Sequence, residues 1–149
     1  MIKKPSLTIL IPAYNEEKYI KKSTLETLKY LKKLNLPSFE IIIIPNGCTD
    51  NTEKMAKELY KRYKQVKWIV SEKGAGNAIK TGIKKASKDV ITWVFADGEM
   101  DYRFIDRGLK LMKSYDLING SRFKKSGKFG VERSLDKKSI SNALRRTLS

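Results

Sequence analysis

Residues 39–50 read FEIIIIPNGCTD, and this stretch does most to define the fold. The run that begins at Phe39 is too uniformly apolar to leave one face in water, so it predicts a strand that is buried on both faces. The turn PNGCTD ends this strand, and Asp50 and Glu53 have the spacing of a capping box at the start of a helix. A buried strand followed by a helix is the unit from which parallel sheets are built.

Apolar runs alternate with helical patterns on both sides of this stretch. Further strands are expected at residues 7–11, 66–70, 89–97 and 116–123. Helices are expected at about 15–34, after residue 50, at 71–87 and around 104–115, and Asn15 is a plausible cap for the first of them. Trp68 and Trp93 lie within expected strands and are assigned to the core. The pattern predicts an α/β domain with a mostly parallel sheet and helices on both of its faces.

Ligands of such sheets bind beyond the carboxyl ends of the strands. Here those ends carry the segments PAYNE, PNGCTD, SEKGAG and ADGEMD, which should converge on one edge. The stretch FADGEMD at residues 95–101 places Asp97, Glu99 and Asp101 close together. These acids could bind a metal ion, or they could form a solvated turn with a helix cap.

The composition of the 149 residues limits the chemistry of any site. The chain has no histidine, which excludes a histidine general base and a histidine-bound zinc ion. A metal would therefore be held by oxygen ligands, which favours Mg²⁺ or Mn²⁺. Cys48 is the single cysteine and no signal peptide or membrane span is visible, so we expect a cytoplasmic protein.

The net charge of +16 is concentrated in part toward the C-terminus. Residues 121–149 contain nine basic residues and two acidic ones. Such a segment could contact nucleic acid, anionic lipid or a phosphorylated ligand, and charge alone does not choose among them.

Five segments resemble, in order, the motifs of the family 2 glycosyltransferases, which have the GT-A fold. They are LTILIPAYNEE, IIIIPNGCTDNT, KGAGNAIKTGI, FADGEMD and INGSRF, and together they extend from Leu7 to Phe123. The G-x-G-N-A form of the third is similar to the polyprenyl-phosphate (dolichol-phosphate) sugar synthases. The resemblance implies metal-dependent transfer, with inversion, of a sugar from a GDP-mannose or UDP-glucose type of donor. It favours a polyprenyl or dolichyl phosphate as the acceptor.

The resemblance also divides the chain and assigns roles to particular residues. Residues 1–123 would form a nucleotide-sugar-binding GT-A domain, and residues 124–149 an acceptor- or membrane-proximal segment that looks short for the family. The expected nucleotide-binding residues are Pro12, Ala13, Tyr14, Glu16, Asn46, Gly76 and Asp97. Asp97 and Glu99 match the positions that bind Mg²⁺ or Mn²⁺, and Asp97 and Arg122 match catalytic positions near the phosphates.

Two positions depart from the family pattern. Phe95 stands where the family has the first aspartate of its metal motif, and Asn46 stands where it has an aspartate that contacts the base. We expect weaker metal or nucleotide affinity, or an altered donor. A nucleotide-sugar-binding module without transferase activity is therefore an alternative.

The high positive charge suggests a second alternative, a nucleic-acid-binding protein, although nucleic acid is not the partner that we expect. Contact of the basic segment with the anionic cytoplasmic face of a membrane is a further hypothesis.

Overall fold

The computed structural model describes residues 4–97, 101–112 and 114–118. Their strands are β1 (Leu7–Ala13), β2 (Phe39–Pro45), β3 (Val66–Trp68) and β4 (Val90–Trp93). The helices are α1 (Ile20–Lys33), α2 (Thr52–Arg62), α3 (Ala75–Lys85) and α4 (Arg103–Leu111). Within these described stretches, no helix is long and apolar enough to cross a membrane.

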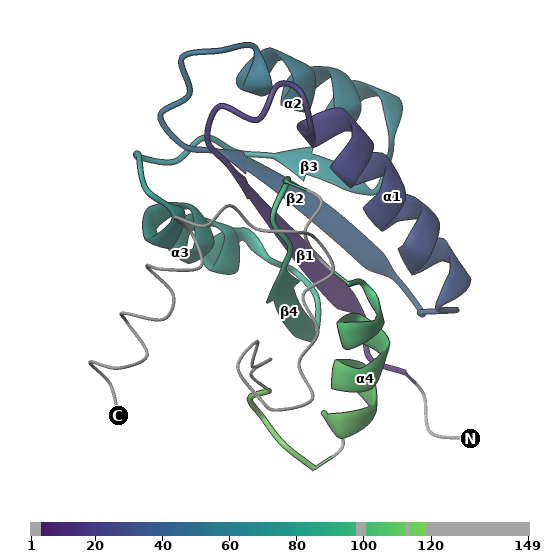
Figure 1. Cartoon of the computed structure of the whole chain (residues 1–149). Helices are drawn as coiled ribbons and strands as arrows, with labels where there is room; N and C mark the ends of the chain where they lie inside the picture. The colour runs from purple at the N-terminus through teal and green to yellow at the C-terminus, as the bar shows by residue number, and fades with distance from the viewer. Residues whose placement is uncertain (1–3, 98–100, 113, 119–149) are drawn as a thin grey trace, which may run out of the picture. The chain divides into compact units, whose positions relative to one another are not determined.

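The strands form a parallel sheet, as the sequence predicts, and their order in it is β3-β2-β1-β4 (Figure 1). Leu7 at the start of β1 is in register with Phe39 of β2 and with Val90 of β4. Because all pairings are parallel, the loops that follow the strands emerge at one edge of the sheet. We call this edge the carboxyl edge.

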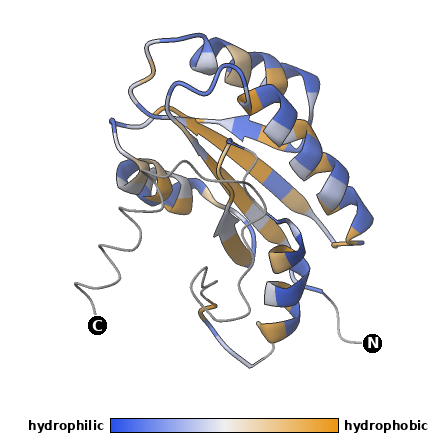
Figure 2. Ribbon diagram, in the orientation of Figure 1, coloured by the Kyte–Doolittle hydropathy of each residue, from blue (hydrophilic) through white to orange (hydrophobic). Residues whose placement is uncertain are grey.

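The central strands are buried on both faces, which explains their uniformly apolar sequences. Ile9 and Ile41 belong to a cluster that contains the buried residues of α1, α2 and α4. Leu10 and Ile42 belong to a second cluster, which contains Ala78 of α3. Figure 1 shows α1 and α2 on one side of the sheet and α3 on the other, and Figure 2 shows the apolar strands between them.

Helix α3 approaches the sheet closely at Gly82. A Cβ atom at this position would lie 2.5 Å from Cδ1 of Ile44 and 2.9 Å from the δ-carbons of Leu10. The absence of a side chain at Gly82 therefore sets the distance between α3 and the centre of the sheet.

The amino ends of the strands hold a buried carboxylate, Glu40. It accepts hydrogen bonds from the hydroxyl of Thr8 at 2.7 Å and from the backbone N–H of Ser87 at 2.7 Å, and it pairs with the ammonium group of Lys67 at 2.6 Å. Burial alone raises the pKa of Glu40, but the hydrogen bonds from Lys67, Ser87 and Thr8 outweigh burial and lower it to about 2.

The start of the first helix was predicted wrongly. Helix α1 begins at Ile20, and Asn15 has a φ of 54°, which is left-handed and not the extended conformation of an N-cap. Asn15 instead bonds the loop after β2: its Oδ1 atom accepts the N–H of Thr49 at 2.8 Å. A contact with a distant loop thus replaces the local cap.

The expected fifth strand lies mostly outside the described residues. Its first part, residues 116–118, is described and is not a strand. The prediction of a strand over 116–123 is therefore wrong for these three residues, and the remainder is outside the described part of the chain.

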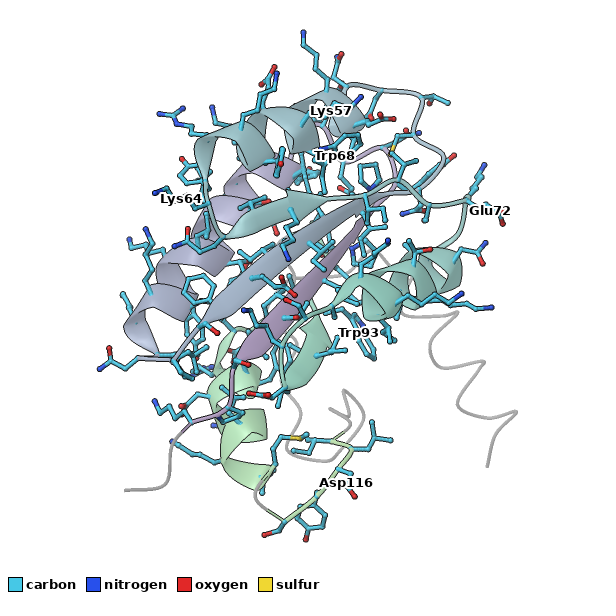
Figure 3. All side chains as sticks on the ribbon, turned by 180° about the vertical axis from the view of Figure 1, so that it is seen from behind. Lys57, Lys64, Trp68, Glu72, Trp93 and Asp116 are labelled. Carbon is cyan, nitrogen blue, oxygen red and sulfur yellow. The ribbon has the colours of Figure 1, made fainter. Side chains whose placement is uncertain are left out.

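The two tryptophans lie on different faces of the sheet. Trp68 is partly buried in the larger cluster, and the ammonium group of Lys57 lies 4.7 Å from its ring centroid (Figure 3). Trp93 is 42% exposed, so its assignment to the core was wrong. It lies on the α3 side of edge strand β4, because it is in register with Leu10, whereas α3 packs mainly on β1 and β2.

Candidate functional site

The fold brings most of the predicted site residues to the carboxyl edge. Pro12 and Ala13 end β1, and Tyr14 and Glu16 lie in the loop that follows it. The other described candidates are Asn46 after β2, Gly76 in the first turn of α3 and Asp97 beyond β4. Glu99 and Arg122 lie outside the described residues.

The side chain of Asn46 is buried and bonded within the protein. Its Nδ2 atom donates to the carbonyl of Ala13 at 2.9 Å and to that of Ile44 at 3.3 Å. Its Oδ1 atom accepts the N–H of Gly74 at 3.2 Å. Asn46 therefore ties the ends of β1 and β2 to the residue that precedes α3.

The loops after β1 and β2 are joined by reciprocal hydrogen bonds. The backbone N–H of Glu16 donates to the hydroxyl of Thr52 at 2.7 Å, and that of Glu17 donates to Asp50 at 3.1 Å. In return, the carboxylate of Glu17 accepts both the backbone and the side-chain N–H of Asn51 at 3.0 Å. These bonds fix the backbone that follows Tyr14.

Asp50 has a larger role than the helix cap that its spacing suggests. Helix α2 begins at Thr52 after Asn51, and Asp50 accepts the Thr52 N–H at 2.9 Å while also bonding Glu17. Burial raises the pKa of Asp50, but the hydrogen bonds from Thr52 and Glu17 outweigh burial and lower it. Asp50 thus stays ionised and accepts hydrogen bonds both from the loop after β1 and from the start of α2.

Lys73 and Tyr14 meet at this edge. The Lys73 ammonium group lies 4.9 Å from the centroid of the Tyr14 ring, and the ring is partly exposed. Gly47 packs against the stem of Lys73: a Cβ atom at Gly47 would be 2.8 Å from Cβ of Lys73. Gly47 also has a φ of 70°, so the turn after β2 requires glycine for two reasons.

The first turn of α3 leaves room for another molecule. Gly74, with a φ of 118°, precedes the helix, and the first N–H groups of any helix have no acceptor within it. A Cβ atom at Gly76 would meet no protein atom within 4 Å. The backbone here can be approached closely, and the positive end of the helix dipole favours an anion.

The acidic stretch after β4 is only partly described. Val94 and Ala96 are buried, Phe95 is half-buried and Asp97 is exposed. Asp101 pairs with the guanidinium group of Arg103 at 2.7 Å, a bond that lowers the pKa of Asp101. Asp101 thus serves the start of α4, and Asp97 is the described carboxylate of this stretch that suits a metal ion.

The described residues contain no cluster of three or more histidine, cysteine or acidic side chains that could hold a metal. An oxygen ligand such as Asp97 suits Mg²⁺ or Mn²⁺, since magnesium is bound through one or two carboxylates and keeps several waters. The donor set is therefore compatible with such an ion.

Sequence reasoning missed Lys73, Thr52 and Gly47. The signal for Gly47 was present, because an Asn-Gly pair favours a turn with positive φ. Nothing in the sequence pairs Lys73 with Tyr14 or Thr52 with Glu16, since these contacts depend on how neighbouring loops meet.

Residues 8–148 match the family described as Glycosyl transferase family 2. A dolichyl-phosphate beta-glucosyltransferase from Trichomonas vaginalis is 30% identical over 145 residues, which are 89% of this chain and 44% of that protein. A dolichol-phosphate mannosyltransferase from Pyrococcus furiosus is 32% identical over 125 residues, 82% of this chain and 34% of that protein. The chain thus spans less than half the length of these curated relatives.

Solved structures share the fold at lower identity. Glucosyl-3-phosphoglycerate synthase from Mycobacterium tuberculosis, in complex with Mn²⁺, UDP and glucosyl-3-phosphoglycerate, has a TM-score of 0.57 and 19% identity over 75% of this chain and 41% of its own. A mannosyltransferase from Pyrobaculum calidifontis, in complex with GDP-Man and Mn²⁺, has a TM-score of 0.51 and 20% identity over 63% of this chain and 28% of its own. The motifs at the carboxyl edge, the parallel α/β fold and these matches lead to one conclusion: the chain belongs to glycosyl transferase family 2 and has the GT-A fold.

Proposed function

We propose that the chain binds a nucleoside-diphosphate sugar at the carboxyl edge and transfers the sugar, with inversion, to a polyprenyl or dolichyl phosphate. The observation that carries the proposal is the convergence of Tyr14, Asn46, Gly76 and Asp97 on one edge of a parallel sheet. The names of the relatives support the lipid-phosphate acceptor. The two structural neighbours were solved in complex with GDP-Man and with UDP, which supports the donor class.

Each residue has a chemical role in this proposal. Pro12 and Ala13 shape the edge, the Tyr14 ring offers a face for the base, and the open backbone at Gly76 admits the ligand. The backbone N–H of Glu16 is held by the hydroxyl of Thr52, and we assign the Glu16 carboxylate to the ribose. We assign Arg122 to the phosphates, where a guanidinium group forms bidentate hydrogen bonds.

Asp97 together with Glu99 would hold Mg²⁺ or Mn²⁺. When bound, the ion neutralises the charge that develops on the leaving diphosphate. Asp97 lies beyond the end of β4 and is exposed, so a ligand can reach it. A lipid phosphate is already an anion, so the reaction does not require the histidine base that this chain lacks.

Calorimetric titration tests the donor half of the proposal. GDP-mannose, UDP-glucose, GDP and UDP are titrated with Mn²⁺ and with EDTA, into the wild type and Asp97→Asn. We expect one donor to bind with Mn²⁺ and to lose about tenfold or more in affinity in EDTA or in the variant. The matched control is Asp116→Asn, an exposed aspartate beyond the end of α4 (Figure 3), which should bind like the wild type.

A transfer assay with a polyprenyl phosphate then separates an enzyme from a binding module. Donor binding without transfer would support the module, for which Phe95 in place of an aspartate is the argument. Failure of every donor to bind, in a folded protein, would refute the proposal.

The basic segment is tested on the full chain with vesicles. We propose that residues 124–149 contact anionic lipid, so co-sedimentation should require phosphatidylserine and should weaken as salt is raised. Equal binding to neutral vesicles, or preference for RNA or DNA, would contradict this assignment.

A further inference from the structure

The internal bonds of Asn46 point to a role that differs from base contact. We propose that Asn46 positions the site, and that the base of the nucleotide is recognised by Lys73 and Tyr14. The proposal rests on the nucleotide-sugar function proposed above and names the part of the site that reads the base.

The first argument is that the amide of Asn46 is already committed. Both of its N–H groups donate to carbonyls, of Ala13 and Ile44, and its oxygen accepts the N–H of Gly74. The residue is only 3% exposed. A base could contact the N–H groups of Asn46 only if these bonds broke in a buried place, where an unpaired carbonyl or N–H is costly. The amide oxygen has a second lone pair, but it belongs to a residue with almost no exposed surface.

The second argument is that these bonds place Lys73. The backbone on one side of Lys73 is held by Asn46 through Gly74, and on the other side the N–H of Ser71 donates to the carbonyl of Pro45 at 3.0 Å. Gly47 packs against the stem of the lysine. The β3–α3 loop is therefore fixed at both ends, and its lysine lies over Tyr14.

The third argument concerns the order of the strands. Asp97 follows β4 at one side of the sheet, whereas Lys73 and Asn46 follow β3 and β2 on the other side of β1. Two strand spacings, about 10 Å, separate β4 from β2. A nucleotide that lies along the edge with its diphosphate near Asp97 would thus have its base near Tyr14 and Lys73.

The chemistry of this pair selects a class of base. An ammonium group only donates hydrogen bonds, so it favours a base with a carbonyl oxygen on its edge, as in uracil and guanine. The tyrosine ring supplies a stacking face of the kind that aromatic side chains offer to bases. The inferred ligand is a nucleoside diphosphate with such a base, in preference to ADP.

Asn46→Asp distinguishes the two roles of Asn46. If the residue contacted the base, the aspartate would restore the residue that the family uses, and the variant should bind at least as tightly as the wild type. If Asn46 is a positioning residue, the new carboxylate would face the carbonyls of Ala13 and Ile44 and lack a donor for them. We then expect UDP or GDP to bind about tenfold more weakly at pH 7.5.

The pH profile is the readout that a general loss of stability would not reproduce. Once protonated, the carboxyl group that Asn46→Asp introduces can donate to Ala13 and accept from Gly74, so the affinity of this variant should recover toward pH 5 relative to the wild type. Among the described residues, the other titratable groups near this position are the Cys48 thiol, which donates to the Ala13 carbonyl at 3.2 Å, and Lys73, whose stem packs against the adjacent Gly47. Both are present in the wild type, whose profile serves as the reference. Wild-type or tighter binding by the variant at pH 7.5 overturns the positioning role.

Lys73→Met tests the base contact, with Lys64→Met as the matched control. Lys64 precedes β3 and Lys73 follows it next to Glu72, and Figure 3 shows Lys64 and Glu72 at opposite ends of that strand. We expect Lys73→Met to weaken UDP or GDP binding about tenfold and to abolish the preference over ADP, while Lys64→Met changes neither. Unchanged binding by Lys73→Met, or equal wild-type affinity for ADP, overturns the assignment.

The outcomes separate this inference from the proposed function. If the folded wild type binds no nucleoside diphosphate, both the proposed function and the base contact fail. The positioning role of Asn46 is then still tested by amide hydrogen exchange, because Asn46→Ala removes the acceptor of the Gly74 N–H and should speed exchange there about tenfold or more. No change at Gly74 would overturn the positioning role independently of any ligand.

Discussion

The hydroxyl of Thr52 at the start of α2 accepts a hydrogen bond from the backbone N–H of Glu16, in the loop after β1, at 2.7 Å. Thr52 is completely buried in the first turn of α2. The helix after β2 therefore supplies an acceptor to the loop after β1. The shape of the β1 loop depends on its neighbour as much as on its own sequence.

Thr52→Val should test this dependence. The substitution keeps the volume but removes the acceptor, which leaves the Glu16 N–H unpaired and should lower the free energy of unfolding by about 1–3 kcal/mol. Nucleotide affinity should fall as well, because Tyr14 and Glu16 lose their support. Chemical denaturation and calorimetry measure the two effects.

The control for this variant is Thr27→Val. Thr27 is also buried, and it donates to the carbonyl of Ser23 within α1 at 2.8 Å. This variant should lose stability without losing nucleotide affinity. Equal effects of both variants on affinity would argue against a specific role of Thr52.

Gly76→Ala should separate ligand contact from folding. A Cβ atom at Gly76 meets no protein atom within 4 Å, and alanine is the better helix former, so the free energy of unfolding should rise by up to about 1 kcal/mol. If the nucleotide approaches this backbone, its affinity should fall about tenfold. Gly108→Ala in α4, where a Cβ atom is equally free, is the matched control and should leave affinity unchanged. Identical affinities in the two variants would remove Gly76 from the site.

Gly47→Ala should damage both stability and binding. The φ of 70° and the 2.8 Å approach to Cβ of Lys73 both oppose a side chain at this position. We expect a loss of about 1–2 kcal/mol in the free energy of unfolding and a displaced Lys73. Thermal and chemical denaturation measure the first effect and nucleotide titration the second. A variant as stable as the wild type would show that the turn relaxes at no cost.

Acid should destabilise the domain through Glu40. Its folded pKa of about 2 lies below the usual value of 4.5, so its contribution is complete above pH 4.5 and is lost as the pH falls toward 2. The contribution amounts to at most about 3 kcal/mol. Glu40→Gln should be less stable at pH 7, because it loses the Lys67 pair, and its stability should fall less between pH 4.5 and 2. If the free energy of unfolding fell equally in the variant and the wild type between pH 4.5 and 2, this assignment would be contradicted.

The two central strands were predictable because burial on both faces leaves a plain signal in the sequence. The edge strands lack that burial, and both are shorter than the predicted ranges 66–70 and 89–97. The apolar run at Phe39 and the glycine that opens α3 both have local causes, and both are placed correctly. The start of α1 was misplaced because Asn15 bonds Thr49, a partner that no local pattern reveals. Trp93 was assigned to the core because periodicity in a strand does not show whether a helix covers it.

For the candidate site, the positions of the residues could be predicted from the sequence, but their hydrogen bonds could not. Parallel strands must share a carboxyl edge, so Tyr14, Asn46 and Asp97 could be placed together from the sequence alone. The hydrogen-bond partners of each side chain could not be predicted. Asn46 is an example, since its amide serves Ala13 and Gly74, and this follows only from the way in which three loops meet.

The placement of the two tryptophans provides intrinsic spectroscopic probes of the two faces of the sheet. Trp68 is packed with the α2 side beneath Lys57, whereas Trp93 is partly in water on the α3 side. Trp68→Phe and Trp93→Phe would each leave a single emitter, with bluer fluorescence from Trp68 and redder, more easily quenched fluorescence from Trp93. During unfolding, the two emission signals would show whether both layers of helices separate from the sheet in one step or in two.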